Sequence, residues 1–184
     1  MVSKDDSLRI SSRSDHEGRE DLIGEHPYGD TGQVVCLVIF LIVWVLDSFL
    51  FKLSIFLAAS IPLLFRLGIA FIILLTGCYL AGSGLRIVFK EVRDPPSVIR
   101  KGVFAHTRHP IYLAAMFVYL ASVIATISLV SLLLLVLIFI FYNYIASYEE
   151  KMLVQKFGQE YLEYKKIVPK WRLRLKTAKF EHSA

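Results

Sequence analysis

Four long apolar runs constrain this chain more than any other feature. They lie at about residues 34–51, 61–88, 110–126 and 128–147, and 55% of the whole chain is hydrophobic. A helix needs ~20 apolar residues to cross the hydrocarbon core of a bilayer. Inside the hydrocarbon a backbone must satisfy its own hydrogen bonds, which helices do within one segment. The sequence therefore predicts an all-α integral membrane protein with four transmembrane helices.

The flanking segments divide the chain into three parts. Residues 1–30 carry eight acidic and four basic residues and show no apolar periodicity, so we expect a mobile polar tail. This tail lacks the apolar core of a signal peptide. Residues 31–170 then form the membrane domain, and residues 171–184 form a basic tail.

Lysine and arginine are distributed unevenly around the four runs. Four precede the first run, six lie between Arg86 and Arg108, and nine lie between Lys151 and Lys179. Only Lys52 and Arg66 fall on the opposite side. The positive-inside rule then places both termini and the central segment in the cytoplasm. Anionic lipid headgroups, and not nucleic acid, are the expected partners of these charges.

Some residues inside the first two runs are not apolar. Asp47 interrupts the first run near its end, where we expect its carboxylate to reach water at the interface. The second run carries a face of small residues, which predicts close packing against another helix. These small residues are Gly77, Ala81, Gly82, Ser83 and Gly84.

Two polar clusters lie at positions that a helical hairpin would bring together. Arg108, His109 and Tyr112 open the third run, and Glu149 and Glu150 close the fourth. The third and fourth runs are nearly equal in length and almost nothing separates them, so they predict a tight antiparallel hairpin. Dense polar side chains at a membrane boundary indicate a functional site. The alternatives are a structural salt bridge and a pocket for a polar cofactor beside a lipid-facing entrance.

The segment before the third run predicts a turn and then a helix start. Gly102 permits a backbone turn that other residues resist, and proline is favoured in the first turn of a helix, which suits Pro110. His106 and His109 stand three residues apart, but the proline follows directly and no third ligand is evident. The sequence therefore predicts no metal site.

The residues after the fourth run predict a short amphipathic helical segment. Met152, Leu153 and Phe157 recur at helical spacing, and Gly158 is a plausible C-cap. An apolar stripe continues beyond it among lysines, which is typical of a helix that lies on a membrane. The stripe consists of Tyr161, Tyr164 and Val168.

Several of these motifs together resemble a known family. They are Gly102-Val103-Phe104, Arg108-His109-Pro110-Ile111-Tyr112, Glu149-Glu150, the segment from Phe157 to Tyr164, and Val168-Pro169. Over about residues 86–170 the chain resembles the isoprenylcysteine carboxyl methyltransferase family, and it is similar to the related phospholipid methyltransferases.

The resemblance implies S-adenosylmethionine as cofactor, in a cytoplasmic pocket, and a lipophilic acceptor that enters from the bilayer. We predict Arg108 and Glu150 as the catalytic residues. By motif match, the predicted cofactor-binding residues are Val98, Ile99, Phe104, His109, Pro110, Tyr112 and Glu149.

Three departures from the family pattern concern the acceptor. Ile145 stands where these enzymes carry a substrate-binding arginine, Pro95-Pro96-Ser97 replaces a histidine, and Ala114 replaces a glycine. The carboxylate of a prenylated cysteine, a membrane lipid amine and another hydrophobic molecule therefore all stay open as acceptors.

Two other functions compete with methyl transfer. Sterol reductases share a similar His-Pro-x-Tyr motif and use NADPH, but Ser147-Tyr148-Glu149 stands where they carry Arg-Asp-Glu. A non-catalytic membrane protein that kept the fold is the second alternative.

Overall fold

The computed structural model describes residues 29–90 and 96–174, and every regular element in these ranges is helical. The predicted mobile tail therefore lies almost wholly outside the described residues. In chain order the elements are α2 (Gly29–Val45), a π-helix (Leu46–Phe51), a 3-10 helix (Phe56–Ser60), α3 (Leu63–Lys90), a 3-10 helix (Gly102–Ala105), α4 (Pro110–Thr126), α5 (Leu129–Phe157) and α6 (Gln159–Ile167).

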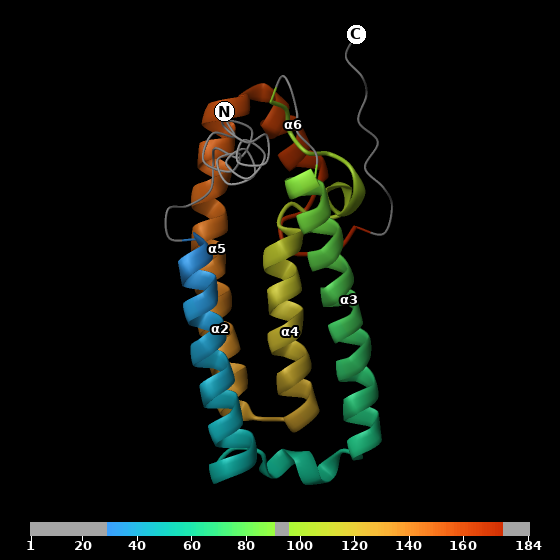
Figure 1. Cartoon of the computed structure of the whole chain (residues 1–184), viewed down its shortest axis with the longest axis vertical. Helices are drawn as coiled ribbons and strands as arrows, with labels where there is room; N and C mark the ends of the chain where they lie inside the picture. Colours follow the sequence, from blue (N-terminus) through green and yellow to red (C-terminus); the bar gives the residue numbers. More distant parts are fainter. Residues whose placement is uncertain (1–28, 91–95, 175–184) are drawn as a thin grey trace, which may run out of the picture.

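The helices α2, α3, α4 and α5 run side by side, and α6 lies across one end (Figure 1). We call this the α6 end, and the opposite end, where α4 turns into α5, the hairpin end. The most extensive contact joins α3 to α4, and α2 packs mainly on α5. The predicted all-α fold and the predicted α4–α5 hairpin are confirmed.

Three helical stretches are long and apolar enough to cross a membrane. They are Thr31–Phe51, Leu63–Phe89 and Leu129–Phe157. The helix α4 is apolar but has only 17 residues, or about 26 Å at 1.5 Å per residue. It carries more buried side chains than its neighbours, whereas α2, α3 and α5 expose many large hydrophobic ones. Such surfaces fit lipid, and the fourth crossing stays a prediction.

Glycines on α3 explain its close contact with α4. A Cβ atom at Gly77 would lie 3.2 Å from the backbone oxygen of Ala114, and one at Gly84 would lie 3.1 Å from Ile111 Cγ1. Larger residues at these two positions would push the helices apart. The prediction of a packing face is confirmed there, whereas a Cβ atom at Gly82 would meet nothing within 4 Å.

Asp47 corrects one expectation. Its side chain does not reach water, because the residue is only 4% exposed at the hairpin end. The carboxylate accepts hydrogen bonds from Ser54 N at 3.1 Å, from Ser54 Oγ at 2.5 Å and from Ser128 Oγ at 2.6 Å. Ser128 is the N-cap of α5 and accepts a bond from Ser131 N. Asp47 therefore ties the end of α2 to the start of α5.

Candidate functional site

A short turn directs the chain into α4 at the α6 end. Gly102 has a φ of +57°, and a Cβ atom there would lie 2.6 Å from Ile87 Cδ1. Only glycine avoids both the backbone strain and this clash. Pro110 occupies the first turn of α4, and His109 directly before it is the N-cap. Both predictions for this segment are confirmed, and Arg108 and His109 are thereby fixed at the mouth of the helix.

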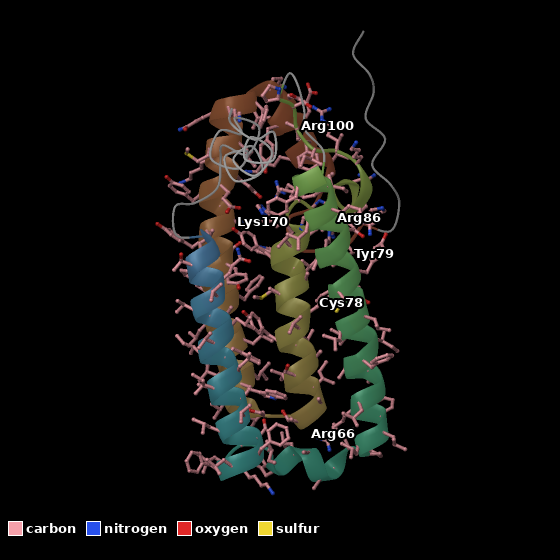
Figure 2. All side chains as sticks on the ribbon, viewed as in Figure 1. Arg66, Cys78, Tyr79, Arg86, Arg100 and Lys170 are labelled. Carbon is pink, nitrogen blue, oxygen red and sulfur yellow. The ribbon has the colours of Figure 1, made fainter. Side chains whose placement is uncertain are left out.

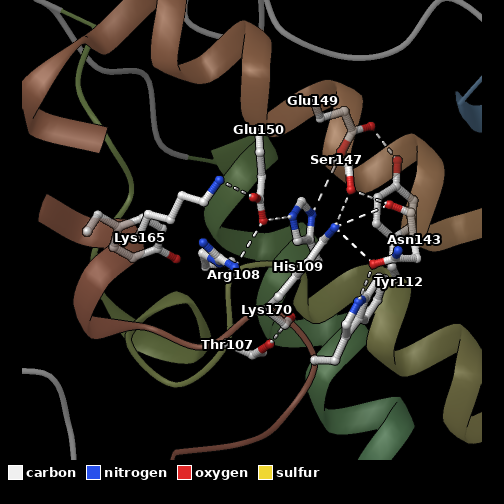
Figure 3. A network of polar contacts seen from close by, with 12 residues as sticks. Thr107, Arg108, His109, Tyr112, Asn143, Ser147, Glu149, Glu150, Lys165 and Lys170 are labelled. Carbon is white, nitrogen blue, oxygen red and sulfur yellow. Dashed lines mark hydrogen bonds and ion pairs between the residues drawn. The ribbon is translucent and has the colours of Figure 1, made fainter. Parts of the chain in front are cut away.

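Glu150 lies at the centre of a network of charged groups (Figure 3). Its carboxylate lies 3.3 Å from Arg108 Nη2, 3.2 Å from His109 Nε2 and 2.9 Å from Lys165 Nζ. Glu150 is 4% exposed. A buried carboxylate is tolerated when it is paired and hydrogen-bonded, as it is here by three groups from two segments, the one before α4 and α6.

Glu149, the residue before Glu150 on α5, faces the first turn of α4. It accepts a hydrogen bond from the hydroxyl of Tyr112, and its Oε2 lies 3.8 Å from His109 Nδ1. The rings of His109 and Tyr112 are stacked, with centroids 5.7 Å apart. We call these residues together with Arg108, Glu150 and Lys165 the polar network. The α4–α5 hairpin brings Arg108, His109 and Tyr112 together with Glu149 and Glu150, as the sequence predicted.

Burial controls the charge of His109. It lowers the pKa of the imidazole below the ordinary value, and the neighbouring charges of Lys170 and Arg108 act in the same direction, against Glu150. The ring is therefore neutral near pH 7. A neutral ring that donates from Nε2 to Glu150 keeps its lone pair on Nδ1, on the side of Glu149.

A partly enclosed cavity of about 110 Å³ adjoins the polar network. We call it the aromatic cavity, and it lies between the segment before α4 and the helices α5 and α6. Arg108 borders both the cavity and the network. The lining residues are Ser97, Val98, Ile99, Phe104, Arg108, Leu153, Phe157, Tyr161 and Tyr164.

Arg108 has hydrogen-bonding capacity to spare. Its side chain is 10% exposed, and Nη2 pairs with Glu150. Among the described residues, its Nε and Nη1 find no hydrogen-bond partner although both atoms are buried. Buried donors without partners are costly and rare in native structures, so these two atoms are candidate donors to a ligand.

The wall of the aromatic cavity is held by α6. Tyr164 donates its hydroxyl to Phe104 O at 2.7 Å, and Glu160 accepts a bond from Val98 N at 3.3 Å. Glu160 also pairs with Arg100 at 3.2 Å. The expectation that the apolar stripe of α6 lies on the membrane is therefore wrong. Its residues Tyr161, Tyr164 and Val168 are 3%, 2% and 1% exposed because they pack on protein.

A second hollow opens within the apolar part of the bundle. We call it the membrane crevice. It has a volume of about 240 Å³ and is almost wholly apolar. Tyr142 connects it to the polar network, because its ring centroid lies 5.4 Å from that of Tyr112. The lining residues are Gln33, Val34, Leu37, Ala115, Val118, Tyr119 and Tyr142.

The structure groups the predicted site residues in two adjoining places. Val98, Ile99 and Phe104 line the aromatic cavity, and Arg108 lines it too while joining the polar network. His109, Tyr112, Glu149 and Glu150 lie in the network. Pro110 is fully buried and serves the start of α4. Ile145, at the departure noted above, is 1% exposed and packs in the core.

Other residues of the site were missed. Leu153, Phe157, Tyr161 and Tyr164 line the cavity, and their helical spacing was interpreted as a membrane-facing stripe. The Glu150 partner Lys165 was counted only as a membrane-surface charge. The contacts made by the segment after α6 carry no sequence signal, because only the fold brings that segment back to α4.

Comparison with known proteins agrees with this geometry. No curated protein and no solved structure matches the chain. Residues 65–160 match the family described as phospholipid methyltransferase. The matched range is more than half of the chain and includes most of α3, the segment before α4, the hairpin and both glutamates of the network. The chain therefore belongs to the phospholipid methyltransferase family, which includes the isoprenylcysteine carboxyl methyltransferases and indicates a membrane methyltransferase.

Proposed function

We propose that this protein is an S-adenosylmethionine-dependent methyltransferase that acts on a lipophilic acceptor from the bilayer. One observation carries the proposal. Arg108 of the polar network lines the aromatic cavity, and Tyr112 of the network contacts Tyr142, which lines the apolar membrane crevice, so the network adjoins a space suited to a cofactor and a space suited to a lipid chain. A structural salt bridge would need neither space.

The residues present fit S-adenosylmethionine. The aromatic cavity suits a flat purine, and the unpartnered Nε and Nη1 of Arg108 suit the acceptor atoms of that ligand. The carboxylate of Glu149 suits its ammonium group. Val98, Ile99 and Phe104 would hold the adenosine portion, and His109, Tyr112 and Glu149 would hold the amino-acid portion.

When bound, the sulfonium cofactor supplies an already reactive methyl group. The protein therefore has mainly to align the acceptor and exclude water. Tyr112 donates to the Glu149 carboxylate and fixes it, and Glu150 fixes Arg108 and His109. Glu150 already has three partners, which favours a positioning role over the role of general base.

The membrane crevice provides a route for the acceptor. Its apolar lining suits a hydrocarbon chain, and Tyr142 and Tyr112 lead from it to Glu149. The carboxylate of a prenylated cysteine and the amine of a membrane lipid are the two candidate acceptors. A carboxylate needs no base, whereas an amine must lose a proton, and the neutral Nδ1 of His109 is suited to accept it.

The distribution of basic residues gives the orientation of the bundle in the membrane. Lys52 precedes and Arg66 follows the connection between the π-helix and α3 at the hairpin end, where Figure 2 labels Arg66. Arg86, Arg100 and Lys170 are labelled toward the α6 end. We therefore propose that the site and both termini face the cytoplasm and that four helices cross the bilayer.

Calorimetric titration of the detergent-purified protein tests the proposal. We expect saturable binding of S-adenosylmethionine and no binding of NADPH. Glu149→Ala and His109→Ala should each weaken that binding while the protein stays folded. Binding of NADPH alone would support a reductase, and binding of neither by folded protein would support a non-catalytic role.

A further inference from the structure

The segment after α6 returns along the chain that leads into α4. Pro169 O accepts a hydrogen bond from Arg108 N at 3.0 Å, and Lys170 O accepts one from Thr107 Oγ1 at 3.0 Å. Arg174 N donates to His106 O at 3.0 Å. These bonds fix the backbone of Lys170 beside the polar network, outside the range that matches the family.

The ammonium group of Lys170 lies against neutral groups of α5. Nζ lies 2.7 Å from Ser147 Oγ, 3.0 Å from Asn143 Oδ1 and 3.2 Å from Asn143 O (Figure 3). In residues 29–90 and 96–174, no carboxylate forms an ion pair with this nitrogen. Its pKa is lowered, chiefly by burial. The ring of Trp171 also lies 5.6 Å from Nζ. A cation held by neutral oxygens and an aromatic ring lacks a counter-ion.

The charges of the neighbourhood lead to the same conclusion. Arg108, Lys165 and Lys170 are three fixed cations, and Glu149 and Glu150 are the two carboxylates that face them. His109 is neutral and adds no charge. Among these five groups of the described chain, the cations outnumber the carboxylates by one, and the cation without an ion pair is Lys170.

The surroundings of Lys170 indicate an amphiphilic partner. Trp171 donates Nε1 to Asn143 Oδ1 at 2.9 Å, and its ring centroid lies 5.9 Å from that of His109 and 5.3 Å from that of Phe139. On α5, Phe139 is 40% exposed and Ile140 is 59% exposed. The ammonium thus lies where the lipid-facing surface of α5 meets the polar network.

We propose that Lys170, with Asn143 and Ser147, binds the oxyanion of the lipophilic methyl acceptor. The oxyanion is a carboxylate or a phosphate, and its hydrocarbon chain lies along the apolar part of the bundle. Lys170 is a positioning residue that selects acceptors with a negative charge near the methylated atom. This inference rests on the proposed function and deepens it.

Native mass spectrometry of the full chain with lipid probes tests the inference. The carboxylate probe is N-acetyl-S-farnesylcysteine, with its methyl ester as the neutral match. The phosphate probe is phosphatidic acid, with diacylglycerol of the same chains as the neutral match. We expect the protein to bind at least one anionic probe about tenfold or more tightly than its neutral match, the size of a charge-assisted hydrogen bond.

Three variants distinguish this role from a structural one. Lys170→Met should abolish the preference for the anionic probe, and Lys170→Arg should restore it. The matched control is Lys166→Met, which changes an exposed lysine on α6 and should leave the preference intact. Thermal unfolding shows whether each variant is folded, and Lys170→Gln replaces Lys170→Met if the latter is not.

The outcomes separate the acceptor classes and the two proposals. A preference confined to the carboxylate probe supports a prenylcysteine-like acceptor, and one confined to the phosphate probe supports a phospholipid. No preference in the wild-type protein, or an unchanged preference in Lys170→Met, overturns the inference. Calorimetry with S-adenosylmethionine is run alongside, and Lys170→Met should bind it as the wild type does. Loss of that binding in the wild type would instead contradict the proposed function.

Discussion

The two ends of the bundle each hold a buried carboxylate, but they use it differently. At the hairpin end Asp47 accepts three hydrogen bonds from neutral donors of two serines. At the α6 end Glu150 faces two fixed cations and a histidine, and Arg108 beside it keeps two buried donors without partners in the described chain. The first arrangement is satisfied by the protein itself, and the second is not.

This difference separates a structural site from the proposed functional one. A buried acid whose acceptors are matched by nearby donors needs no ligand. A cluster with spare donors and an adjoining cavity has the groups and the space to take a ligand. Asp47 and Glu150 are equally buried, so burial alone does not distinguish their roles.

The largest expected effect is the loss of Glu150. Glu150→Ala leaves Arg108 and Lys165 without their counter-ion, and breaking a buried pair by removing one partner typically costs about 3–5 kcal/mol. We expect a strongly lowered midpoint of thermal unfolding in detergent. Glu163→Gln, which changes an exposed carboxylate on α6, is the matched control. Equal stability of both variants would mean that the network contributes little to folding.

Removal of Asp47 should reduce stability but not binding. Asp47→Ala deprives the Ser54 and Ser128 hydroxyls of their acceptor, and hydrogen bonds to charged groups are worth about 1.5–3 kcal/mol. Thermal unfolding should detect this loss. Calorimetry should show unchanged affinity for S-adenosylmethionine, and a clear loss of affinity would mean that the two ends are coupled.

Arg108→Lys tests whether the unpartnered donors at the α6 end bind the cofactor. Lysine can keep a pair with Glu150 but cannot also present the Nε and Nη1 donors toward the aromatic cavity. We expect affinity for S-adenosylmethionine to fall about tenfold, as for the loss of one hydrogen bond to a charged donor. The unfolding midpoint should change little. A variant with normal affinity would show that the unpartnered donors do not face the cofactor.

The smallest effect is a pH dependence of stability. Burial lowers the pKa of His109 in the folded protein, so the unfolded chain binds the proton first as the pH falls below ~6.5. Stability should therefore drop by about 1 kcal/mol or less between pH ~7 and ~5.5. His109→Gln should flatten this part of the profile, because glutamates of the unfolded chain titrate near pH ~4.3. A profile unchanged by the substitution would show that His109 is protonated equally in both states.

The sequence predicted much of this molecule, because apolar length and the short connection at Ile127 dictate the helices and the hairpin. Pairing of Arg108 and His109 with Glu149 and Glu150 followed from antiparallel geometry alone. The role of Asp47 did not, because its partner Ser128 lies 81 positions away. The packing of α6 also escaped prediction, because a stripe of tyrosines among lysines fits a protein surface as well as a membrane.

The segment after α6 shows a second limit. Lys170 was one basic residue among nine in its part of the chain, and only the fold places its ammonium beside Ser147. No periodicity or spacing marks such a contact, since it depends on how an irregular segment returns to α4. The part of the site where α4 meets α5 was therefore predictable, and the part formed by the irregular segment after α6 was not.

Transfer of a labelled methyl group tests the central claim most directly. Purified protein in mixed lipid and detergent micelles is incubated with methyl-labelled S-adenosylmethionine and either N-acetyl-S-farnesylcysteine or phosphatidylethanolamine. We predict label in the organic-soluble product with the wild type and with Asp47→Ala, and little or none with Glu149→Ala. A folded wild type that binds the cofactor and transfers no label to either acceptor, or a Glu149→Ala variant as active as the wild type, would contradict the account.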